Sequence, residues 1–492
     1  MSYHKYHLTS ISVDSAGLDI LESYEINGAR IYITRDGKYL VNEPYLPEDG
    51  GELYNSILSR MDLTYAIRED SMDPGMLEDK FETEFWATAS RLKRQDEARR
   101  DFANLSYYSQ RNMLGFDILD VLQRDPHIED VLCSAPARPV RIIHNQYSGR
   151  FHTLETNIMF EDERQMRGFI QKTFSKTGSE PTESIPISVT YMKDGSRISC
   201  TFGSQVTKPG PIIAIRKFPE SPITITGMIQ SKTISLEAAA YMWTLFDAQA
   251  VGLVIGATGS GKTTLMSAMM TMLNPSWRIL TIEDTLELRV PHADWVRYNT
   301  RKSYGMLSDK FNVTIRHLID SSLTQRPDFE IVGEIRVDDM DSLFQAVGTG
   351  HGGLTSFHAY SPYGAITRLR GNGIGDGEIS LLWFVVHARK INIRQDGIIT
   401  AVRRVNDISE VVPNKDGSIR IDKIFEYFRD GDIIKRIKPL NESQRYVEAT
   451  DILGIMNHTH DMNIRMELLN RCVTSKANKP EEIFKILGTY YQ

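Results

Sequence analysis

A run of glycines that ends in a lysine and a threonine stands near the middle of the chain. Gly256–Thr263 reads GATGSGKT, which is the spacing of a loop that cradles nucleotide phosphates. Glycines let a backbone approach phosphate oxygens closely, and a helix that starts at such a loop adds aligned N–H donors and its dipole. Lys262 is expected to reach the β- and γ-phosphates, and the Thr263 hydroxyl to bind Mg²⁺. The predicted nucleotide-binding residues are Gly256, Ala257, Thr258, Gly259, Ser260, Gly261, Lys262, Thr263 and Thr264.

Carboxylates follow two other apolar runs and could turn nucleotide binding into hydrolysis. Glu334 ends one run, where it could orient or deprotonate an attacking water, or reach Mg²⁺ through a water molecule. Glu283, Asp284 and Glu287 follow another run. Acidic residues at the start of a helix explain this second group equally well, because they complement the helix dipole. Glu334 is therefore the stronger candidate for the hydrolytic step.

Two histidines, His351 and His358, flank a short apolar run further along the chain. They are seven residues apart with no helical pattern between them, so they form only a weak candidate metal pair. A histidine at the end of a strand usually has a structural role. His358, however, follows a predicted strand at the edge where open α/β sheets bind ligands.

Four short apolar runs between residues 233 and 395 would position these side chains. They alternate with helical stretches, and this rhythm predicts a mostly parallel, doubly wound sheet and hence an α/β fold. The predicted strands are Val251–Ile255, Arg278–Glu283, Phe329–Val332 and Gly353–Phe357. The tail that follows, to residue 492, is expected to hold short strands and then helices.

The residues upstream predict a separate α+β domain over 106–222. Val140–His144 and Ile212–Arg216 alternate like strands, and Asp194-Gly195 is typical of a tight hairpin turn. The run Phe218–Pro222 ends this region with turn-forming residues. We therefore predict a linker over residues 223–232 and a nucleotide-hydrolysing domain, tail included, over 233–492.

Residues 1–105 are predicted to be an accessory region. Ala29–Ile33 is typical of a strand. Within the charged stretch from Asp79 to Asp101, apolar residues recur at helical spacing, which predicts an amphipathic helix with one packed face. These apolar residues are Phe81, Phe85, Ala89 and Leu92.

Composition narrows the functional classes. With 492 residues the chain is expected to fold as two or three domains, and its net charge of −7 disfavours a general nucleic-acid binder. The three cysteines are far apart without a CxxC pair, so we expect no zinc site and a reducing compartment. The first residues contain no apolar signal-peptide core, and no apolar run approaches the roughly 20 residues that cross a bilayer. We therefore expect a cytoplasmic protein that reaches a membrane only through a partner.

The order of these motifs resembles that of the secretion-motor ATPase superfamily, which drives type II secretion, type IV secretion, type IV pili and archaella. Four motifs occur in the family's order: Walker A (Gly256–Thr263), an acidic Asp box (Thr281–Glu287), Walker B (Ile331–Arg336) and a His box (Thr349–Ala359). Asp125–Val131 also resembles the start of the N-domain in the archaeal branch of this superfamily. The resemblance covers roughly residues 106 to 395.

This resemblance implies a RecA-like motor domain preceded by an α+β, PAS-like N-domain, assembled as a homo-hexamer that hydrolyses ATP with Mg²⁺. Arg197 and Arg216 would neutralise phosphate charge during transfer. Glu287 would assist Glu334 at the metal and water, and His358 would sense the γ-phosphate. The expected metal-binding residues are Thr263, Glu283, Asp284 and Glu334. The implied partner is an integral membrane platform protein of a pilus, archaellum or secretion system.

Three functions fit these observations. The first is a motor that couples ATP hydrolysis to assembly or rotation of a pilus-like filament. The second is a nucleic-acid translocase or helicase on a similar core, which the acidic net charge and the lack of a basic, aromatic stripe disfavour. The third is a scaffold that binds ATP but hardly hydrolyses it.

Overall fold

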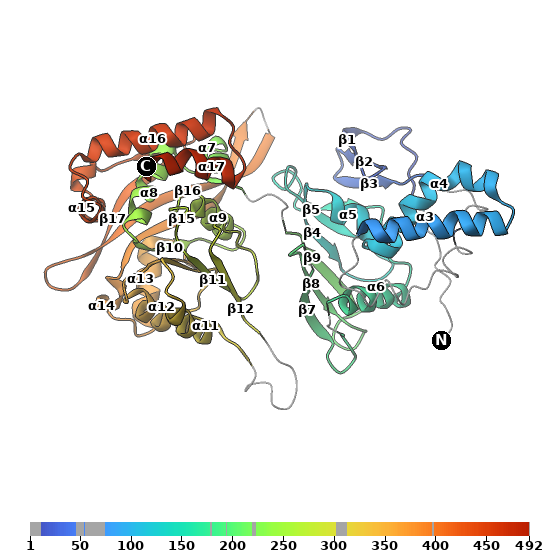
Figure 1. The fold of residues 1–492 in the computed structure, drawn as a ribbon, viewed down its shortest axis with the longest axis horizontal. Coiled ribbons are helices and arrows are strands. Elements are labelled where there is room, and N and C mark those ends of the chain that lie inside the picture. Colours follow the sequence, from blue (N-terminus) through green and yellow to red (C-terminus); the bar gives the residue numbers. More distant parts are fainter. Residues whose placement is uncertain are drawn as a thin grey trace. The chain divides into compact units, whose positions relative to one another are not determined.

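The structure, a computed structural model, divides into two compact units, residues 1–220 and 221–492. It describes residues 11–45, 54, 74–177, 180–192, 194–218, 223–301, 312–395 and 398–491. Figure 1 shows both units as ribbons coloured along the sequence. Residues 219–222 of the run expected to end the upstream domain lie outside the described part of the chain.

The first unit contains a nine-stranded sheet in the order β1-β2-β3-β6-β5-β4-β9-β8-β7. Its strands are β1 (Ile20–Ile26), β2 (Ala29–Thr34), β3 (Lys38–Asn42), β4 (Ile128–Cys133), β5 (Arg141–His144), β6 (Leu154–Thr156), β7 (Ile187–Tyr191), β8 (Arg197–Thr201) and β9 (Ile212–Arg216). Its α-helices are α3 (Pro74–Arg91), α4 (Gln95–Ser109), α5 (Asp120–Arg124) and α6 (Glu163–Ser175).

The strands predicted in this unit are confirmed. The predicted amphipathic helix is confirmed in part, because the stretch from Asp79 to Asp101 forms two helices, α3 and α4, with Leu92 in the turn between them. Phe81, Phe85 and Ala89 of α3 are buried, because a spacing of four residues places them on one face of the helix. The residue-105 boundary predicted from composition lies inside α4, and β3 from one side of it pairs with β6 from the other. The division at residue 105 stays a prediction for the chain's domains.

The second unit is built on another nine-stranded sheet, in the order β12-β11-β13-β14-β10-β15-β16-β17-β18. Its strands are β10 (Val251–Ile255), β11 (Ile279–Glu283), β12 (Trp295–Asn299), β13 (Phe329–Val332), β14 (Gly352–Phe357), β15 (Leu382–Gln395), β16 (Ile398–Pro413), β17 (Ile419–Phe428) and β18 (Ile433–Arg436). Its α-helices are α7 (Ile225–Gln230), α8 (Leu236–Asp247), α9 (Lys262–Met270), α11 (Ile315–Ser322), α12 (Met340–Val347), α13 (Pro362–Gly371), α14 (Asp376–Ile379), α15 (Gln444–Ile452), α16 (His458–Thr474) and α17 (Pro480–Leu487).

The strands from β12 to β15 in this order are parallel, and those from β15 to β18 are antiparallel. Every residue of β10 is buried, with Val254 packing into one hydrophobic cluster and Val251, Leu253 and Ile255 into another. Helices α8 and α9 belong to the first cluster, and α11, α12 and α13 to the second. The predicted α/β class and the four predicted strands are confirmed, because parallel strands covered on both faces are continuously apolar.

The tail differs from the expectation of short strands. Strand β15 has 14 residues and β16 has 16, and together they form a long antiparallel hairpin before the expected helices α15 to α17. The hairpin continues past the end of β10, where the parallel part of the sheet stops. In β15 beyond this point, Ile391 and Ile393 alternate with the exposed Asn392 and Arg394, which is the pattern of a strand with one exposed face. No helix in the described residues has both the length and the apolar character needed to cross a membrane.

Candidate nucleotide-binding site

The strand order of the second unit brings the four sequence motifs to one edge of its sheet. Strands β11, β13, β14 and β10 are neighbours and run parallel, so their carboxyl ends meet at the same edge. Asp284 follows β11, Glu334 follows β13 after one glycine, and His358 follows β14. The loop Gly256–Gly261 follows β10. This edge is where open α/β sheets bind ligands.

The glycine-rich loop joins β10 directly to α9, as predicted. A side chain at Gly256 would place its Cβ 2.3 Å from the carbonyl oxygen of Ala388, so only glycine fits beside β15. Gly261 has a φ of +90°, a backbone conformation that favours glycine, and α9 begins at the next residue, Lys262. The loop therefore presents a helix N-terminus and closely approachable backbone, which is the geometry that binds phosphate.

Lys262 is buried and lies against this loop. Its Nζ atom is 3.2 Å from the carbonyl oxygen of Gly256, 3.4 Å from that of Ala257 and 3.4 Å from Nδ1 of His358. Burial lowers the pKa of Lys262, and the negative charges of Glu334 and Glu287 oppose that shift. An ammonium group held in this way is well placed to receive phosphate oxygens.

His358 links Lys262 to Glu334. Its Nε2 atom is 2.9 Å from Oε1 of Glu334, while its Nδ1 atom faces Lys262. Arg368 donates a hydrogen bond of 2.8 Å to the backbone carbonyl of His358 and lies over the ring of Phe357. The side chains of His358 and Glu334 remain 41% and 57% exposed, so a ligand can reach both. A lysine, a histidine and a carboxylate thus meet beside the phosphate-binding loop.

Glu283 shapes the loop of the Asp box. Its Oε1 atom accepts hydrogen bonds from the backbone N–H groups of Glu287 and Leu288, at 2.8 and 2.7 Å. Its Oε2 atom is buried and accepts no hydrogen bond from the residues that the structure describes. Burial raises the pKa of Glu283 to about 7, although the two N–H groups lower it. One oxygen of Glu283 therefore positions Glu287, and the other is the buried oxygen that could still take a ligand.

Oxygen donors suited to Mg²⁺ surround the loop. Among the described residues, no three or more His, Cys, Asp or Glu are grouped as a preformed metal site. Mg²⁺ does not need such a group, because it is commonly held by one or two carboxylates, substrate phosphates and waters. The Thr263 hydroxyl, the Glu334 carboxylate and the orphaned Oε2 of Glu283 fit that chemistry. Asp284, in contrast, already accepts a hydrogen bond of 2.9 Å from Thr300. The predicted metal set stays a prediction.

The two histidines of the His box lie at opposite ends of β14. His351 precedes the six-residue strand and His358 follows it, about 20 Å away at the rise of a strand. The weak metal-pair interpretation of these two residues is therefore wrong. His351 instead lies near buried Glu330, with 3.9 Å between its Nε2 atom and Oε2 of Glu330.

Glu330 provides a stability prediction that is independent of catalysis. It is fully buried, and burial raises its pKa from 4.5 to about 7, although Ser322 donates a hydrogen bond of 2.7 Å to it. A folded-state pKa above the unfolded value stabilises the fold below pH 4.5, and this contribution is lost as the pH rises through 7. We expect Glu330→Gln to gain up to about 3 kcal/mol of unfolding free energy relative to wild type between pH 4.5 and 8.

Thermal unfolding of wild type and the Glu330→Gln variant at pH 5 and pH 8 checks this. The variant should melt higher relative to wild type at pH 8 than at pH 5. Glu467→Gln, on the exposed face of α16, is the matched control and should show no such difference. An equal Tm difference for the Glu330 variant at both pH values would contradict the assignment.

The first unit places two predicted arginines directly beside each other. Arg197 on β8 is opposite Arg216 on β9, and Asp130 on β4 is the next residue in the same row. The Nε atom of Arg216 is 3.3 Å from Oδ1 of Asp130, whereas the buried Nε atom of Arg197 has no hydrogen-bond partner among the described residues. Like charges directly opposite in a ladder are destabilising. The row thus brings two guanidinium groups and one carboxylate together, and the predicted phosphate contact of the arginines stays a prediction.

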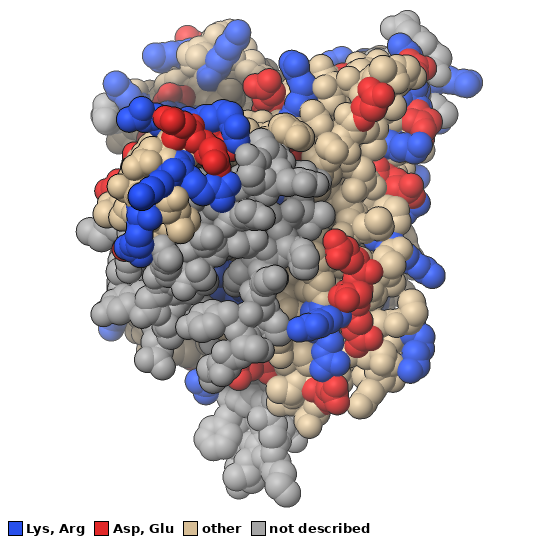
Figure 2. All heavy atoms as spheres, turned by 90° about the vertical axis from the view of Figure 1, so that its right-hand side faces the viewer, with Lys and Arg blue, Asp and Glu red and all other residues tan. Residues whose placement is uncertain are grey.

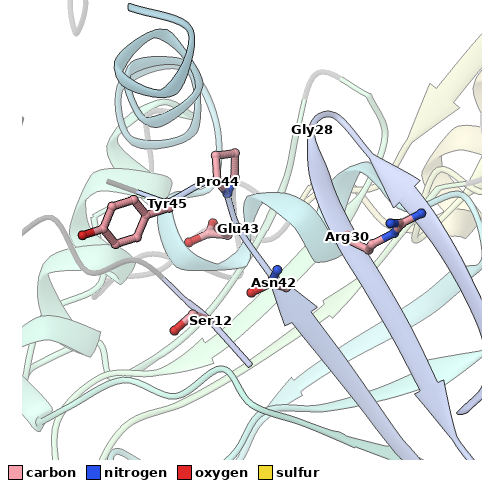
Figure 3. A pocket seen from close by; sticks show the side chains of 7 residues that line it. All are labelled: Ser12, Gly28, Arg30, Asn42, Glu43, Pro44 and Tyr45. Carbon is pink, nitrogen blue, oxygen red and sulfur yellow. The ribbon is translucent and has the colours of Figure 1, made fainter. Parts of the chain in front are cut away.

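A second surface feature of the first unit is a hollow near the ends of β2 and β3 (Figure 3). Its lining residues are Ser12, Gly28, Arg30, Asn42, Glu43, Pro44 and Tyr45. The Glu43 carboxylate is already engaged, by Arg111 at 2.7 Å and by the Tyr107 hydroxyl at 2.8 Å. The hollow contains none of the predicted site residues.

Sequence reasoning missed one side chain at the loop. The Nε atom of Arg403, on β16, is 3.5 Å from the carbonyl oxygen of Gly259. Arg403 is more than 140 positions from the loop in the chain, and no motif marks it. Only the register of the β15–β16 hairpin against β10 brings it there.

Comparison with known proteins supports the assignment of this site to one family. Residues 144–407, more than half of the chain, match the family described as "Type II/IV secretion system protein". The uncharacterized protein MJ0900 of Methanocaldococcus jannaschii is 33% identical over 328 residues, which cover 66% of this chain and 56% of MJ0900. Protein VirB11 of Agrobacterium fabrum is 39% identical over 118 residues, 24% of this chain and 33% of VirB11.

The chain spans only about half the length of MJ0900 and a third of MJ0781 from the same archaeon. Among solved structures, the ATPase DotB of Yersinia pseudotuberculosis matches 76% of this chain and 92% of its own, with 15% identity and a TM-score of 0.44. The family match includes all four motifs and both Arg197 and Arg216. The chain belongs to the type II/IV secretion system protein family.

Proposed function

We propose that this chain is a motor ATPase that hydrolyses MgATP at the carboxyl edge of the second unit's sheet. The observation that carries the proposal is the contact of Lys262 with His358 and of His358 with Glu334, beside a complete phosphate-binding loop. A loop alone explains binding. Hydrolysis also needs a group that orients or deprotonates the attacking water, and the Glu334 carboxylate beside His358 can do so.

In this proposal each group has a role. Backbone N–H groups of the loop and Lys262 hold the β- and γ-phosphates and stabilise the charge that develops during transfer. Glu334 orients and deprotonates the attacking water, and His358, between Lys262 and Glu334, senses the γ-phosphate. Mg²⁺, when bound, would be held by oxygen atoms of Thr263, Glu283 and Glu334 and would neutralise phosphate charge. Glu287 is positioned by Glu283 to assist at the water.

Arg197 and Arg216 neutralise phosphate charge in this proposal. Their side-by-side placement supports the role, because two guanidinium groups on one face favour an anion. The Nε atom of Arg197, which has no hydrogen-bond partner in the described part of the chain, supports it as well. We further propose that the second unit is RecA-like, that the first contains a PAS-like α+β domain, and that the working form is a homo-hexamer in the cytoplasm. Its partner would be an integral membrane platform protein of a pilus-like filament or secretion machine.

A nucleic-acid translocase is the alternative that most needs a test. Figure 2 shows Lys and Arg interspersed with Asp and Glu on the described part of one face of the first unit. Mixed charge of this kind disfavours binding that depends on neutralising many phosphates. We expect the rate of ATP hydrolysis to stay unchanged when single- or double-stranded DNA is added. Stimulation by DNA that falls steeply with salt would favour the translocase.

Affinity purification tests the partner. The Glu334→Gln chain with ATP and the Lys262→Ala chain without it serve as baits for detergent-solubilised membranes of the source organism. The proposal predicts that a polytopic membrane protein is enriched with the ATP-bound bait over the other. Equal recovery of all membrane proteins by the two baits would count against a nucleotide-dependent membrane partner.

A further inference from the structure

Arg403 reaches the phosphate-binding loop from outside the four motifs. Its Nε atom donates towards the carbonyl oxygen of Gly259, and its Cδ atom lies 2.9 Å from the point that a Cβ on Gly261 would occupy. The stem of the side chain therefore packs against the loop, and its guanidinium group lies at the loop's rim. The side chain itself is exposed, so a ligand can reach it.

The hairpin β15–β16 places Arg403 there because it continues where β10 stops. Ile255, the last residue of β10, pairs with His387 of β15, and the carbonyl oxygen of Ala388 fills the space beside Gly256. Beyond this point β15 and β16 continue as a two-stranded antiparallel hairpin next to the loop. Arg403 is in this part of β16, where it pairs with Lys390 of β15.

The two neighbouring arginines of β16 differ in what they contact. Arg404 is buried, and its guanidinium group forms two hydrogen bonds to Asp432 at 2.8 and 2.7 Å. Arg403 points to the other face, where Lys390 is also exposed. Two cations directly opposite in a ladder repel each other, and an anion between them and the loop would relieve that repulsion. Arg404 thus has a structural role, whereas Arg403 and Lys390 form a cationic rim on the loop.

The strand order shows which end of a nucleotide this rim would meet. His358 and Glu334 follow β14 and β13, on one side of β10, whereas β15 and β16 are on the other side. The reacting γ-phosphate belongs beside His358 and Glu334. A phosphate chain that crossed the loop from there would have its α-phosphate end towards the hairpin.

We propose that Arg403, together with Lys390, binds the α-phosphate of ATP and ADP and sets the affinity of the site for nucleotide. The proposal rests on the proposed function only in that the loop binds nucleotide. A guanidinium group suits this task because its N–H groups donate to phosphate oxygens in a fixed fork. The α-phosphate does not react, so the contact is the same before and after hydrolysis. Its loss should weaken ATP and ADP equally.

The test compares Arg403→Ala, Arg403→Lys and Arg389→Ala in the full chain. Arg389 is the matched control, because it is an exposed arginine on the opposite face of the same hairpin. Calorimetry gives the Kd for ADP, and steady-state hydrolysis gives KM and kcat for ATP. We expect Arg403→Ala to raise both Kd and KM about tenfold, a size typical of a charged phosphate contact. Arg403→Lys should recover part of the affinity, and Arg389→Ala should match wild type.

Other outcomes separate the explanations. If Arg403 only braced the loop, Arg403→Ala would misplace Lys262 and lower kcat together with the Tm of the nucleotide-free protein, which would overturn the proposal. An ADP Kd within twofold of wild type would also overturn it, and would leave the hydrolytic function standing. Arg403-dependent ADP binding by a chain that does not hydrolyse ATP would support the proposal and remove the motor function. Wild type that binds no ADP would overturn both.

Discussion

Lys262→Ala is expected to reduce ATP hydrolysis on the order of 10²–10³-fold, the usual cost of removing one group that stabilises transition-state charge. The structure places the Lys262 ammonium group against the carbonyl oxygens of Gly256 and Ala257 and near His358. Alanine removes the ammonium group that contacts both the loop and His358. Phosphate binding and the stabilisation of transition-state charge should therefore both be weakened. Phosphate release at saturating MgATP, with nucleotide Kd measured in parallel, checks this expectation.

Two controls make the Lys262 result interpretable. Because Lys262 is buried, the melting temperature of the nucleotide-free variant must be compared with that of wild type. Lys262→Arg keeps the positive charge but not its compact shape, and should recover binding more than turnover. Near-normal hydrolysis by a folded Lys262→Ala chain would show that another site is responsible.

Glu334→Gln is expected to lower kcat by about 10²–10⁴-fold, the contribution of a positioned general base. Glutamine keeps the shape of the side chain and its contact with His358 at 2.9 Å, but it cannot accept the proton of the attacking water. Nucleotide binding by the loop should persist, so the variant should trap ATP. Burst and steady-state phosphate release, with retention of labelled ATP on the protein, measure the two effects separately.

Glu330→Gln is the matched control for this variant. Glu330 is on the same strand as the residues leading to Glu334, but it is near the opposite end and contacts Ser322 and His351. We expect it to retain hydrolysis. Comparable losses in both variants would point to damage of β13 rather than to loss of a base.

The sequence was sufficient to predict four of the parallel strands of the second unit, β10, β11, β13 and β14, and the loop that follows β10. Val251–Ile255 is continuously apolar because β10 is covered on both faces. For the same reason, the sequence pattern could not predict which of its side chains point to which face of the sheet. The spacing from Gly256 to Lys262 predicted the loop, since few other structures require glycine at those positions. Glu334 and His358 were expected at the sheet edge because each follows such a strand.

Contacts between distant segments could not be predicted in the same way. Glu283 is adjacent to Asp284 in the chain, yet it faces inward and accepts N–H groups, because β11 alternates its side chains between faces. The separation of His351 from His358, in contrast, follows from the predicted strand Gly353–Phe357, which lies between them. Arg403 required two registers, that of β15 against β10 and that of β16 against β15, and the second includes an irregularity between His387 and Ala388.

The first unit shows the same limit. The local patterns predicted β2, β5 and β9, but not that β3 pairs with β6 and joins residues on both sides of position 105 into one sheet. Likewise, Arg216 ended a predicted strand and Arg197 came shortly after a predicted turn, but only the pairing of β8 with β9 places them directly opposite. Pairing depends on long-range packing, which a local pattern does not encode.

The most direct test of the central claim is phosphate release from ATP by the full chain, with Mg²⁺ and with EDTA. It is measured side by side for wild type and for the variant carrying both Lys262→Ala and Glu334→Gln. The account predicts saturable hydrolysis by wild type that requires Mg²⁺ and disappears in the double variant. Mg²⁺-dependent hydrolysis that persists in the double variant, or wild type that binds ATP without turning it over, would contradict it.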